Sequence, residues 1–446
     1  MTAVGLWLLL LLTGYLHIPT PILRIMTKES KLPPLYSRYH QHELQMPQHN
    51  LSQADVQGTK YLWISNYIRG NGWGNVMQEL LLNSYLAYRA NRSFVFTNYT
   101  WTEGGPDFAL YNLRPIPARI PLTALLGGPT VGAPMLAAPD APLAVTKEFW
   151  DEVCPHATVI KDDDVVTSVD GSPTTAGMKV EKWLEKLRTT EDRCVEVPRD
   201  SWSIFDIWIL QDAKRLLDEW PPFSHSPILT EFAWSPLIEL AFDMNRETIS
   251  PSSPLQPYLS SVPLTVKSAE RYARIPGLLA IHVRRGDFVR HCKRLAQWEA
   301  NYVAYNAFPS MPDQQDFPPN TPAPARTEMY RARCYPEIDE IVRRIEEIRN
   351  SEAGQGLQNI YIMTNAPPDW IYDLKAALRR SWGWADIASS RDLLLNQEQG
   401  YVKQAIDMLI GQRAQVFIGN PFSSLSGQVN MLRMANGFSP ESCRLW

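Results

Sequence analysis

Two short apolar runs that flank a helical stretch, between residues 61 and 97, most constrain what this chain can fold into. Residues 61–65 (YLWIS) and 93–97 (SFVFT) are typical of buried strands. Between them lie a glycine-rich turn at residues 70–75 and, from Asn75 to Ala90, apolar residues at helical spacing. Strand, helix and strand in this order form a βαβ unit, whose two strands run parallel. The sequence therefore predicts an α/β protein built on a parallel sheet.

A second alternating series follows in the C-terminal half. It predicts strands at 277–283, 359–364 and 415–419, and helices at 338–348, 370–380, 402–410 and 424–435. Helices are also expected at 207–220 and 237–245, irregular structure at 100–145, and a possible linker in the Ser- and Pro-rich stretch 250–263. We therefore expect two α/β domains, one over 59–265 and one over 266–446, with a ligand cleft outside the carboxyl ends of the strands.

The composition narrows the classes of function. Hydrophobic residues make up 45% and charged residues 20%, which excludes a wholly disordered chain and a multispanning membrane protein. A net charge of −4 argues against a nucleic-acid partner, because such binders need excess cations to displace counterions. The chain has 36 prolines, more than an average protein of this length, and part of this excess lies in an insert at 303–327. Within the insert we expect a mobile surface loop over 308–326.

The N-terminus indicates a secretory location. Residues 4–18 are apolar, but fifteen helical residues span only ~22 Å, less than the ~30 Å of a bilayer core. We expect a signal anchor over 1–26, with a cleaved signal peptide or a buried core helix as alternatives, and a flexible stem over 27–58. Sequons for glycosylation begin at Asn50, Asn91 and Asn98. A lumenal, single-pass type II membrane protein of the endoplasmic reticulum or Golgi, attached to the membrane through this segment, is the expected arrangement.

The five cysteines are too few for a disulfide scaffold, although a lumenal protein is free to form single bridges. Cys292 and Cys334 bracket the Pro-rich insert, and a disulfide between them would close it. Cys154 with Cys194 is a second possible pair, and Cys443 would remain over. Free buried thiols are the alternative.

Residues 281–288 (IHVRRGDF) carry the first set of chemical groups. The strand that ends here presents His282, Arg284, Arg285 and Asp287 at its carboxyl edge, and alternation places His282 and Arg284 on one face. A guanidinium grips two phosphate oxygens at once and stays charged when it loses water, so Arg284 is well placed to hold a pyrophosphate. A salt bridge between arginine and aspartate that closes the turn is the alternative.

Two other segments suit an anion. Residues 416–426 (VFIGNPFSSLS) run from a strand through a Gly-Asn-Pro turn into a helix, whose first N–H groups and serine hydroxyls are donors. Simple capping of that helix by Ser423 or Ser424 is the alternative. In the turn at 70–75 the glycines let the backbone approach a ligand closely, but their positions 70, 72 and 74 do not have the spacing G-x-G-x-x-G.

In this order the three segments resemble the GDP-fucose protein O-fucosyltransferase superfamily. The turn GWGNV is similar to its N-terminal motif, HVRRGDF to the His-x-Arg motif that it shares with α1,6-fucosyltransferases, and Asp407 with RAQVFIGNPFSS to its C-terminal motif. The resemblance covers roughly residues 60–435. It implies a GT-B-like fold, two Rossmann-like domains that face a cleft, and an inverting transfer of fucose from GDP-fucose to an acceptor hydroxyl, expected to be a protein Ser or Thr. No metal or other cofactor is implied.

The resemblance also implies roles for single residues. Arg284 matches the arginine that holds the leaving diphosphate and is the catalytic candidate. Because departure of GDP develops negative charge, a preplaced guanidinium stabilises the transition state more than the ground state. The substrate-binding candidates match guanine-reading residues (His282 and Asp407), phosphate-binding hydroxyls (Ser423 and Ser424) and an asparagine near the sugar and diphosphate (Asn75).

The chain departs from the family pattern in the glycine turn. The glutamate that serves as base in one branch of the family would lie there, where Asn71, Trp73 and Asn75 stand instead. The group that accepts the proton is therefore unassigned. Three alternatives stand beside a protein acceptor: a glycan acceptor, an inactive nucleotide-sugar-binding or lectin-like protein on the same fold, and a metal-dependent glycosyltransferase in which residues 162–164, three aspartates, hold Mn²⁺ or Mg²⁺.

Overall fold

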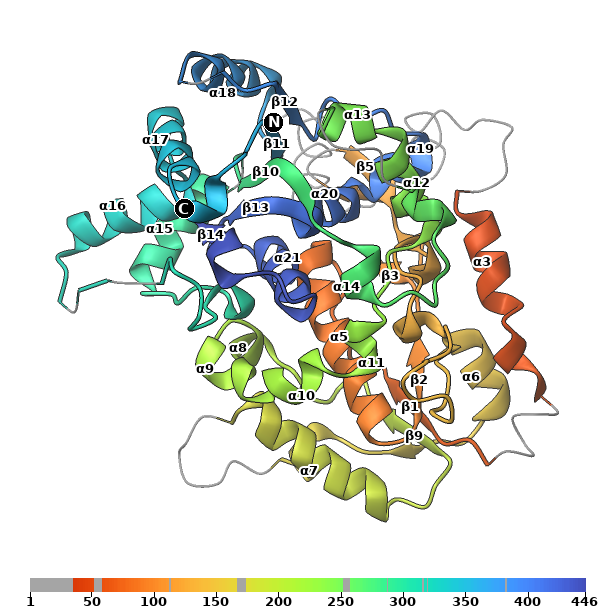
Figure 1. Ribbon diagram of the computed structural model, residues 1–446. Coiled ribbons are helices and arrows are strands. Elements are labelled where there is room, and N and C mark those ends of the chain that lie inside the picture. Colours follow the sequence, from red (N-terminus) through yellow and green to blue (C-terminus); the bar gives the residue numbers. More distant parts are fainter. Residues whose placement is uncertain are drawn as a thin grey trace, which may run out of the picture.

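The computed structural model describes residues 35–51, 58–111, 114–166, 174–251, 257–286, 288–314, 317–318, 320–381 and 383–446. In these ranges the chain forms two five-stranded parallel sheets with helices packed around them (Figure 1). The predicted α/β class with parallel sheets is confirmed. The signal anchor expected at 1–26 lies outside the described residues, and every helix within them is too short or too polar to span a membrane.

The first sheet has the strand order β7-β2-β1-β9-β8, with β1 at its centre. Its strands are β1 (Tyr61–Ile64), β2 (Ser93–Phe96), β7 (Val145–Thr146), β8 (Thr158–Val159) and β9 (Cys194–Val197). Helix α5 (Trp73–Arg89) connects β1 to its parallel neighbour β2, as the βαβ pattern predicts. The stretch after β2 holds only short antiparallel pairs, β3 (Tyr99–Thr100) with β6 (Arg119–Ile120) and β4 (Phe108–Tyr111) with β5 (Arg114–Pro117).

The second sheet has the order β12-β11-β10-β13-β14. Its strands are β10 (Ile275–Val283), β11 (Asn359–Thr364), β12 (Asp386–Ser389), β13 (Ala414–Gly419) and β14 (Cys443–Leu445). The helices of this half are α15 (Phe288–Gln297), α16 (Ala323–Cys334), α17 (Ile338–Arg349), α18 (Pro368–Ser381), α19 (Gln397–Tyr401), α20 (Lys403–Arg413) and α21 (Ser424–Ala435). The strands and helices predicted here agree with the structure to within a few residues. Because β10 and β11 pair with Val283 opposite Thr364, their carboxyl ends lie level.

The stretch 207–220 is helical as expected, but it is divided. The chain forms α8 (Ile207–Leu210), α9 (Ala213–Leu216), a 3-10 helix (Leu217–Glu219) and α10 (Trp220–Ser224). The Asp212 carboxylate accepts a hydrogen bond from the backbone N–H of Lys214, 2.9 Å away, and so starts a new helix inside the apolar pattern. The helix expected at 237–245 is confirmed as α12 (Pro236–Met244). The other helices of this half are α6 (Lys147–Val153), α7 (Ala176–Thr189), α11 (Pro227–Thr230), α13 (Arg246–Ile249) and α14 (Ser268–Arg271).

The largest apolar core contains residues from both halves of the chain. Helices α5 and α21 lie side by side between the two sheets, and α12 packs on α20 (Figure 1). Buried hydrogen bonds cross between the halves as well: the Trp234 indole N–H donates to Oε1 of Gln412, 2.8 Å away. The two sheets are therefore joined by packed helices, which fix their carboxyl edges relative to one another.

Part of the segment expected to be a flexible stem packs on the fold. Residues 37–44 form helix α3 (Ser37–Leu44), and Tyr36 and Met46 on either side of it are buried. The Glu43 carboxylate accepts hydrogen bonds from the backbone N–H and the hydroxyl of Thr123, each 2.9 Å long. The prediction of a flexible stem rested on the polar composition of this segment. Its few apolar and acidic residues have partners only on the surface of the folded domain.

Part of the Pro-rich insert also packs on the fold, where a surface loop was predicted over 308–326. Its first residues, Tyr305, Phe308 and Met311 among them, are buried. The Tyr305 and Phe308 rings both contact the ring of Trp220 in the first half, with centroids 5.8 and 4.8 Å away. Aromatic side chains inside the insert therefore anchor it between the halves, where the abundance of proline indicated a surface loop.

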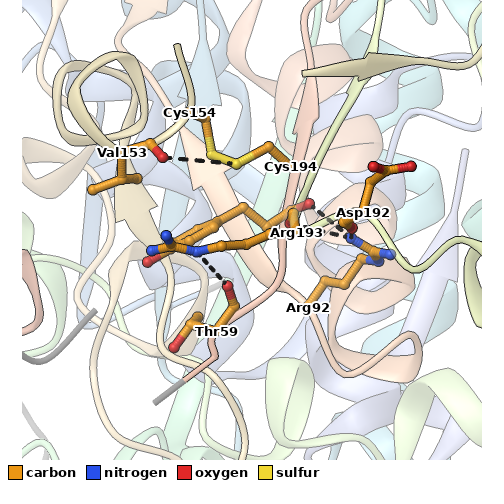
Figure 2. The surroundings of a disulfide bond; sticks show 8 residues. Thr59, Arg92, Val153, Cys154, Asp192, Arg193 and Cys194 are labelled. Atoms are coloured by element: carbon orange, nitrogen blue, oxygen red, sulfur yellow. Dashed lines mark hydrogen bonds between the residues drawn. A yellow bond between two sulfur atoms is a disulfide. The ribbon is translucent and has the colours of Figure 1, made fainter. Parts of the chain in front are cut away.

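The chain contains two disulfides. One joins Cys154 to Cys194, and the other joins Cys292 to Cys334. The first joins the end of α6 to β9, beside a cluster in which Arg92 donates to the Asp192 carbonyl and Arg193 to the Thr59 carbonyl (Figure 2). The second joins α15 to α16 across the insert. Both possible pairs are confirmed, and Cys443 remains as a buried thiol.

Candidate active site

A hydrogen bond connects the carboxyl end of β10 to the first turn of α21. His282 Nδ1 lies 2.8 Å from the Ser426 hydroxyl, which also accepts a hydrogen bond from the backbone N–H of Asn420. His282 is buried, and loss of water together with the charge of Arg284 lowers its pKa to about 3. The imidazole is therefore neutral at physiological pH and acts as a fixed polar contact between the strand end and the helix.

Arg284 and Arg285 have opposite surroundings, as alternation along the strand predicts. Arg284 is half-buried, its guanidinium carbon lies 5.4 Å from the centre of the Phe288 ring, and its side chain lines an open hollow of about 450 Å³. Arg285 is buried between the rings of Tyr335 and Trp370, 4.1 and 4.2 Å from its guanidinium carbon. Only Arg284 is therefore placed to meet a ligand.

Asp407 lies in α20 behind the carboxyl ends of β11 and β12. Its carboxylate accepts hydrogen bonds from the Tyr361 hydroxyl, at 2.7 Å, and from the Ser390 hydroxyl, at 2.9 Å. Burial raises its pKa to about 6. The Ser390 hydroxyl also accepts from the backbone N–H of Thr364, whose own hydroxyl donates to the Val283 carbonyl. Hydrogen bonds thus link Asp407 to the end of β10, although no direct contact joins it to His282.

The N-terminus of α21 has no side-chain cap. Ser423 occupies the N-cap position, but its side chain makes no capping hydrogen bond. The first-turn N–H groups of a helix have no intrahelical acceptor and carry the positive end of the helix dipole. Asn306 donates to the carbonyl of Ser423 and thereby holds the turn from the insert side. The Ser423 side chain therefore does not cap the first-turn N–H groups of this helix.

The glycine turn of the first half meets this helix end. A Cβ atom on Gly74 would lie 2.6 Å from the backbone nitrogen of Leu425, closer than real Cβ contacts allow. Gly74 therefore permits α5 and α21 to approach through their N-termini. Asn75, the next residue, is half-buried at the same junction. The turn at 70–75 and the helix that starts at Ser424 form one site, which brings together the carboxyl edges of both sheets.

The acidic residues 162–164 have a structural task. The Asp162 carboxylate is buried, forms a 2.6 Å ion pair with Lys179 and accepts a hydrogen bond from the Trp183 indole at 2.8 Å. The Asp164 side chain accepts from the backbone N–H of Lys161. No group of three metal-ligating side chains occurs in the part of the chain that the structure describes. These aspartates therefore hold α7 and a short turn in place.

Several polar residues of the site were missed by the sequence prediction. Ser426 lies within the predicted motif but was not selected, although a polar residue in the first helical turn was a usable signal. Tyr361 was predicted only as part of the strand at 359–364, and nothing in the sequence pairs it with Asp407. Asn306 was counted only as part of the Pro-rich insert at 303–327. Only the tertiary structure brings these side chains to the strand ends.

Two parallel sheets define an α/β protein, and an arginine at a strand end and an uncapped helix N-terminus form a candidate anion site where the sheets meet. Residues 262–436 match the family model of the GDP-fucose protein O-fucosyltransferases. Residues 262–436 thus carry the match to this family, and the enzyme class that it supports is that of the fucosyltransferases, which are glycosyltransferases. The matched region begins before β10 and ends after α21, so it includes the second sheet except for β14.

Solved structures of POFUT1 resemble the chain at low identity. A crystal structure of POFUT1 in complex with GDP-fucose shares 16% identity over 84% of this chain and 95% of that chain, with a TM-score of 0.47. A structure in complex with GDP shares 15% over the same fractions, with a TM-score of 0.46. The apo form shares 15% over 84% and 95%, with a TM-score of 0.45. Among curated proteins the chain finds no match.

Proposed function

We propose that this protein is an inverting fucosyltransferase that moves fucose from GDP-fucose to an acceptor hydroxyl, a Ser or Thr of a protein. The family match supports fucose transfer. One structural observation supports the site most directly: the hydrogen bond between His282 and Ser426 holds the strand end that bears Arg284 against the uncapped N-terminus of α21. A guanidinium and a helix N-terminus side by side form a site for a diphosphate.

Each candidate residue has a task in this reaction. Arg284, with the hydroxyls of Ser423 and Ser424 and the N–H groups of their turn, holds the diphosphate. The acceptor oxygen bonds to C1 of fucose while the bond from C1 to the phosphate oxygen breaks. GDP leaves with the electron pair, and the hydroxyl proton of the acceptor is released, in the overall reaction, to the solvent. Asn75 lies where the sugar would meet the other half. His282 and Asp407 contact the guanine, directly or by shaping its pocket.

The proposed location is the secretory lumen, with membrane attachment through the N-terminal segment. Its support is indirect: two disulfides need an oxidising compartment, and the sequon residues Asn50 and Asn91 are exposed.

A nucleotide comparison tests the donor site. GDP should raise the melting temperature of the full chain by mass action, which stabilises a protein by about 2.7 kcal/mol at a hundredfold excess over Kd, whereas UDP should have little effect. Incubation with GDP-fucose and a panel of acceptors should then release GDP, and this release should persist in EDTA. Equal shifts with GDP and UDP would contradict the guanine site. Binding of GDP without any turnover would favour the inactive, lectin-like alternative.

A further inference from the structure

A cationic hollow begins at Arg284 and extends along α15. Phe288, Arg290, His291 and Arg294 line the rest of it, and its volume is about 450 Å³. The rings of Phe288 and His291 lie against one another, with centroids 4.9 Å apart, and form its aromatic wall. Arg290 and Arg294 are exposed at its rim. The hollow thus offers three guanidinium groups and an aromatic surface to a ligand.

The arginines at the rim, Arg290 and Arg294, form no ion pair with the described residues. Exposed cations elsewhere commonly do: Arg38 pairs with Glu398, and Arg199 with Glu103. Two neighbouring arginines without an ion pair raise the local positive potential and attract an anionic partner. The hollow is therefore complementary to negative charge in a protein whose net charge is −4.

The position of the hollow beside Arg284 indicates which kind of anion it binds. In the proposed reaction Arg284 and the open end of α21 already supply cationic and N–H donors to the diphosphate of the donor. A ligand in the hollow would lie beside the leaving phosphate, because Arg284 lines the hollow as well. The additional cations at Arg290 and Arg294 are thus available to the acceptor.

We propose that this hollow binds an acidic segment of the acceptor protein through its Asp and Glu carboxylates. This inference rests on the proposed function and names the substrate class of that site. Arg290 and Arg294 are four residues apart on α15, a rise of about 6 Å. Carboxylates two residues apart on an extended chain are separated by about 6.7 Å, which suits the two guanidinium groups. Each guanidinium binds a carboxylate with two parallel hydrogen bonds.

Charge removal at the rim tests the inference. In the full chain, Arg290→Gln with Arg294→Gln should weaken binding of poly-L-glutamate, measured by fluorescence anisotropy at low salt, at least tenfold. The matched control, Arg379→Gln with Arg380→Gln, removes two exposed arginines from α18 and should change binding less than twofold. All four positions are exposed, and a thermal melt checks that each variant is folded.

Three results would overturn the inference. Equal weakening in both double variants would show a general charge effect. Stronger, variant-sensitive binding of a heparin oligosaccharide than of poly-L-glutamate would assign the hollow to a sulfated glycan. A similar loss of GDP affinity, measured by calorimetry, would assign the rim to the donor. Failure of the proposed function is distinct, because the unmodified chain would then neither bind GDP nor release it from GDP-fucose.

Discussion

Arg284 and Arg285 are chemically identical neighbours, yet their surroundings give them different tasks. Alternation along β10 turns one toward the hollow and the other between two aromatic rings. The backbone N–H of Arg285 also donates to the side-chain oxygen of Asn365, 2.8 Å away, which holds the turn after the strand. We therefore expect substitutions at the two positions to separate turnover from stability.

Arg284→Ala should remain folded and lose turnover by about 10²–10³-fold, because a donor to the developing charge is removed. Arg284→Lys should recover only part of this loss, since an ammonium group lacks the planar fork. Arg285→Ala should lower the melting temperature but keep more of the turnover. Initial rates and thermal melts of the three variants test this. Near-normal turnover of a folded Arg284→Ala variant would contradict the proposed mechanism.

Asp407 should make GDP binding dependent on pH. Its pKa of about 6 means that acidification converts the carboxylate, which in the proposed function accepts from guanine N–H groups, to the protonated form. At pH 5 about a tenth of the protein would be ionised at this position, so GDP should bind about tenfold more weakly than at pH 7.5. His282 cannot cause this change, because its pKa is about 3. Calorimetry between pH 5 and 8 tests the profile, which Asp407→Asn should flatten.

At the scale of elements, the approach of α5 to α21 decides whether a site exists. The two helices come from different halves of the chain and meet through Gly74 and Leu425. An α-helix normally gains about 1 kcal/mol when an interior glycine becomes alanine. Here the tertiary contact reverses that preference, because the helix ends must touch.

Gly74→Ala should therefore destabilise the protein and weaken GDP binding, since its Cβ would force the start of α21 away. Gly400→Ala is the matched control: this exposed glycine lies in helix α19, outside the candidate site, and a Cβ on it meets nothing within 4 Å. Gly74→Ala should have a lower melting temperature and a lower GDP affinity than the control variant. Thermal melts and calorimetry measure the two quantities. Wild-type GDP affinity in Gly74→Ala would refute the role of this junction.

At the scale of the whole molecule, the segment at 35–51 holds both halves. The backbone N–H of Tyr36 donates to the Glu398 carboxylate at 2.6 Å, and the Tyr36 hydroxyl donates to the Glu398 carbonyl at 2.7 Å. Glu398 belongs to α19 in the second half, while Glu43 and Gln48 bond to Thr123, Gly132 and Ala144 in the first half. The segment therefore connects the two sheets from outside, as α5 and α21 do from inside.

Tyr36→Ala should lower the free energy of unfolding by about 3 kcal/mol, because it removes a side chain that is only 1% exposed and its hydrogen bond across the halves. Tyr372→Ala, at a position 72% exposed on α18, should change it by less than 0.5 kcal/mol. Denaturant unfolding measures both values. Equal small effects would mean that the segment adds nothing to stability.

The sequence by itself determined the class of fold and the motifs of the site. Short apolar runs and helical spacing are local patterns, so the strands around 281 and 417 and the turn at 70–75 could be placed from them. Alternation also separated Arg284 from Arg285. The possible cysteine pairs could be named, because each required only that two sequence segments lie close together.

Only the tertiary structure decided which groups meet. Tyr361 and Asp407, His282 and Ser426, and Gly74 and Leu425 lie far apart in sequence, and no local pattern connects them. The same holds for residues 35–51 and the start of the insert, whose polar and Pro-rich composition indicated mobile chain. Their apolar side chains are too few to form a core alone, and they become ordered because the folded surface supplies the partners that burial requires.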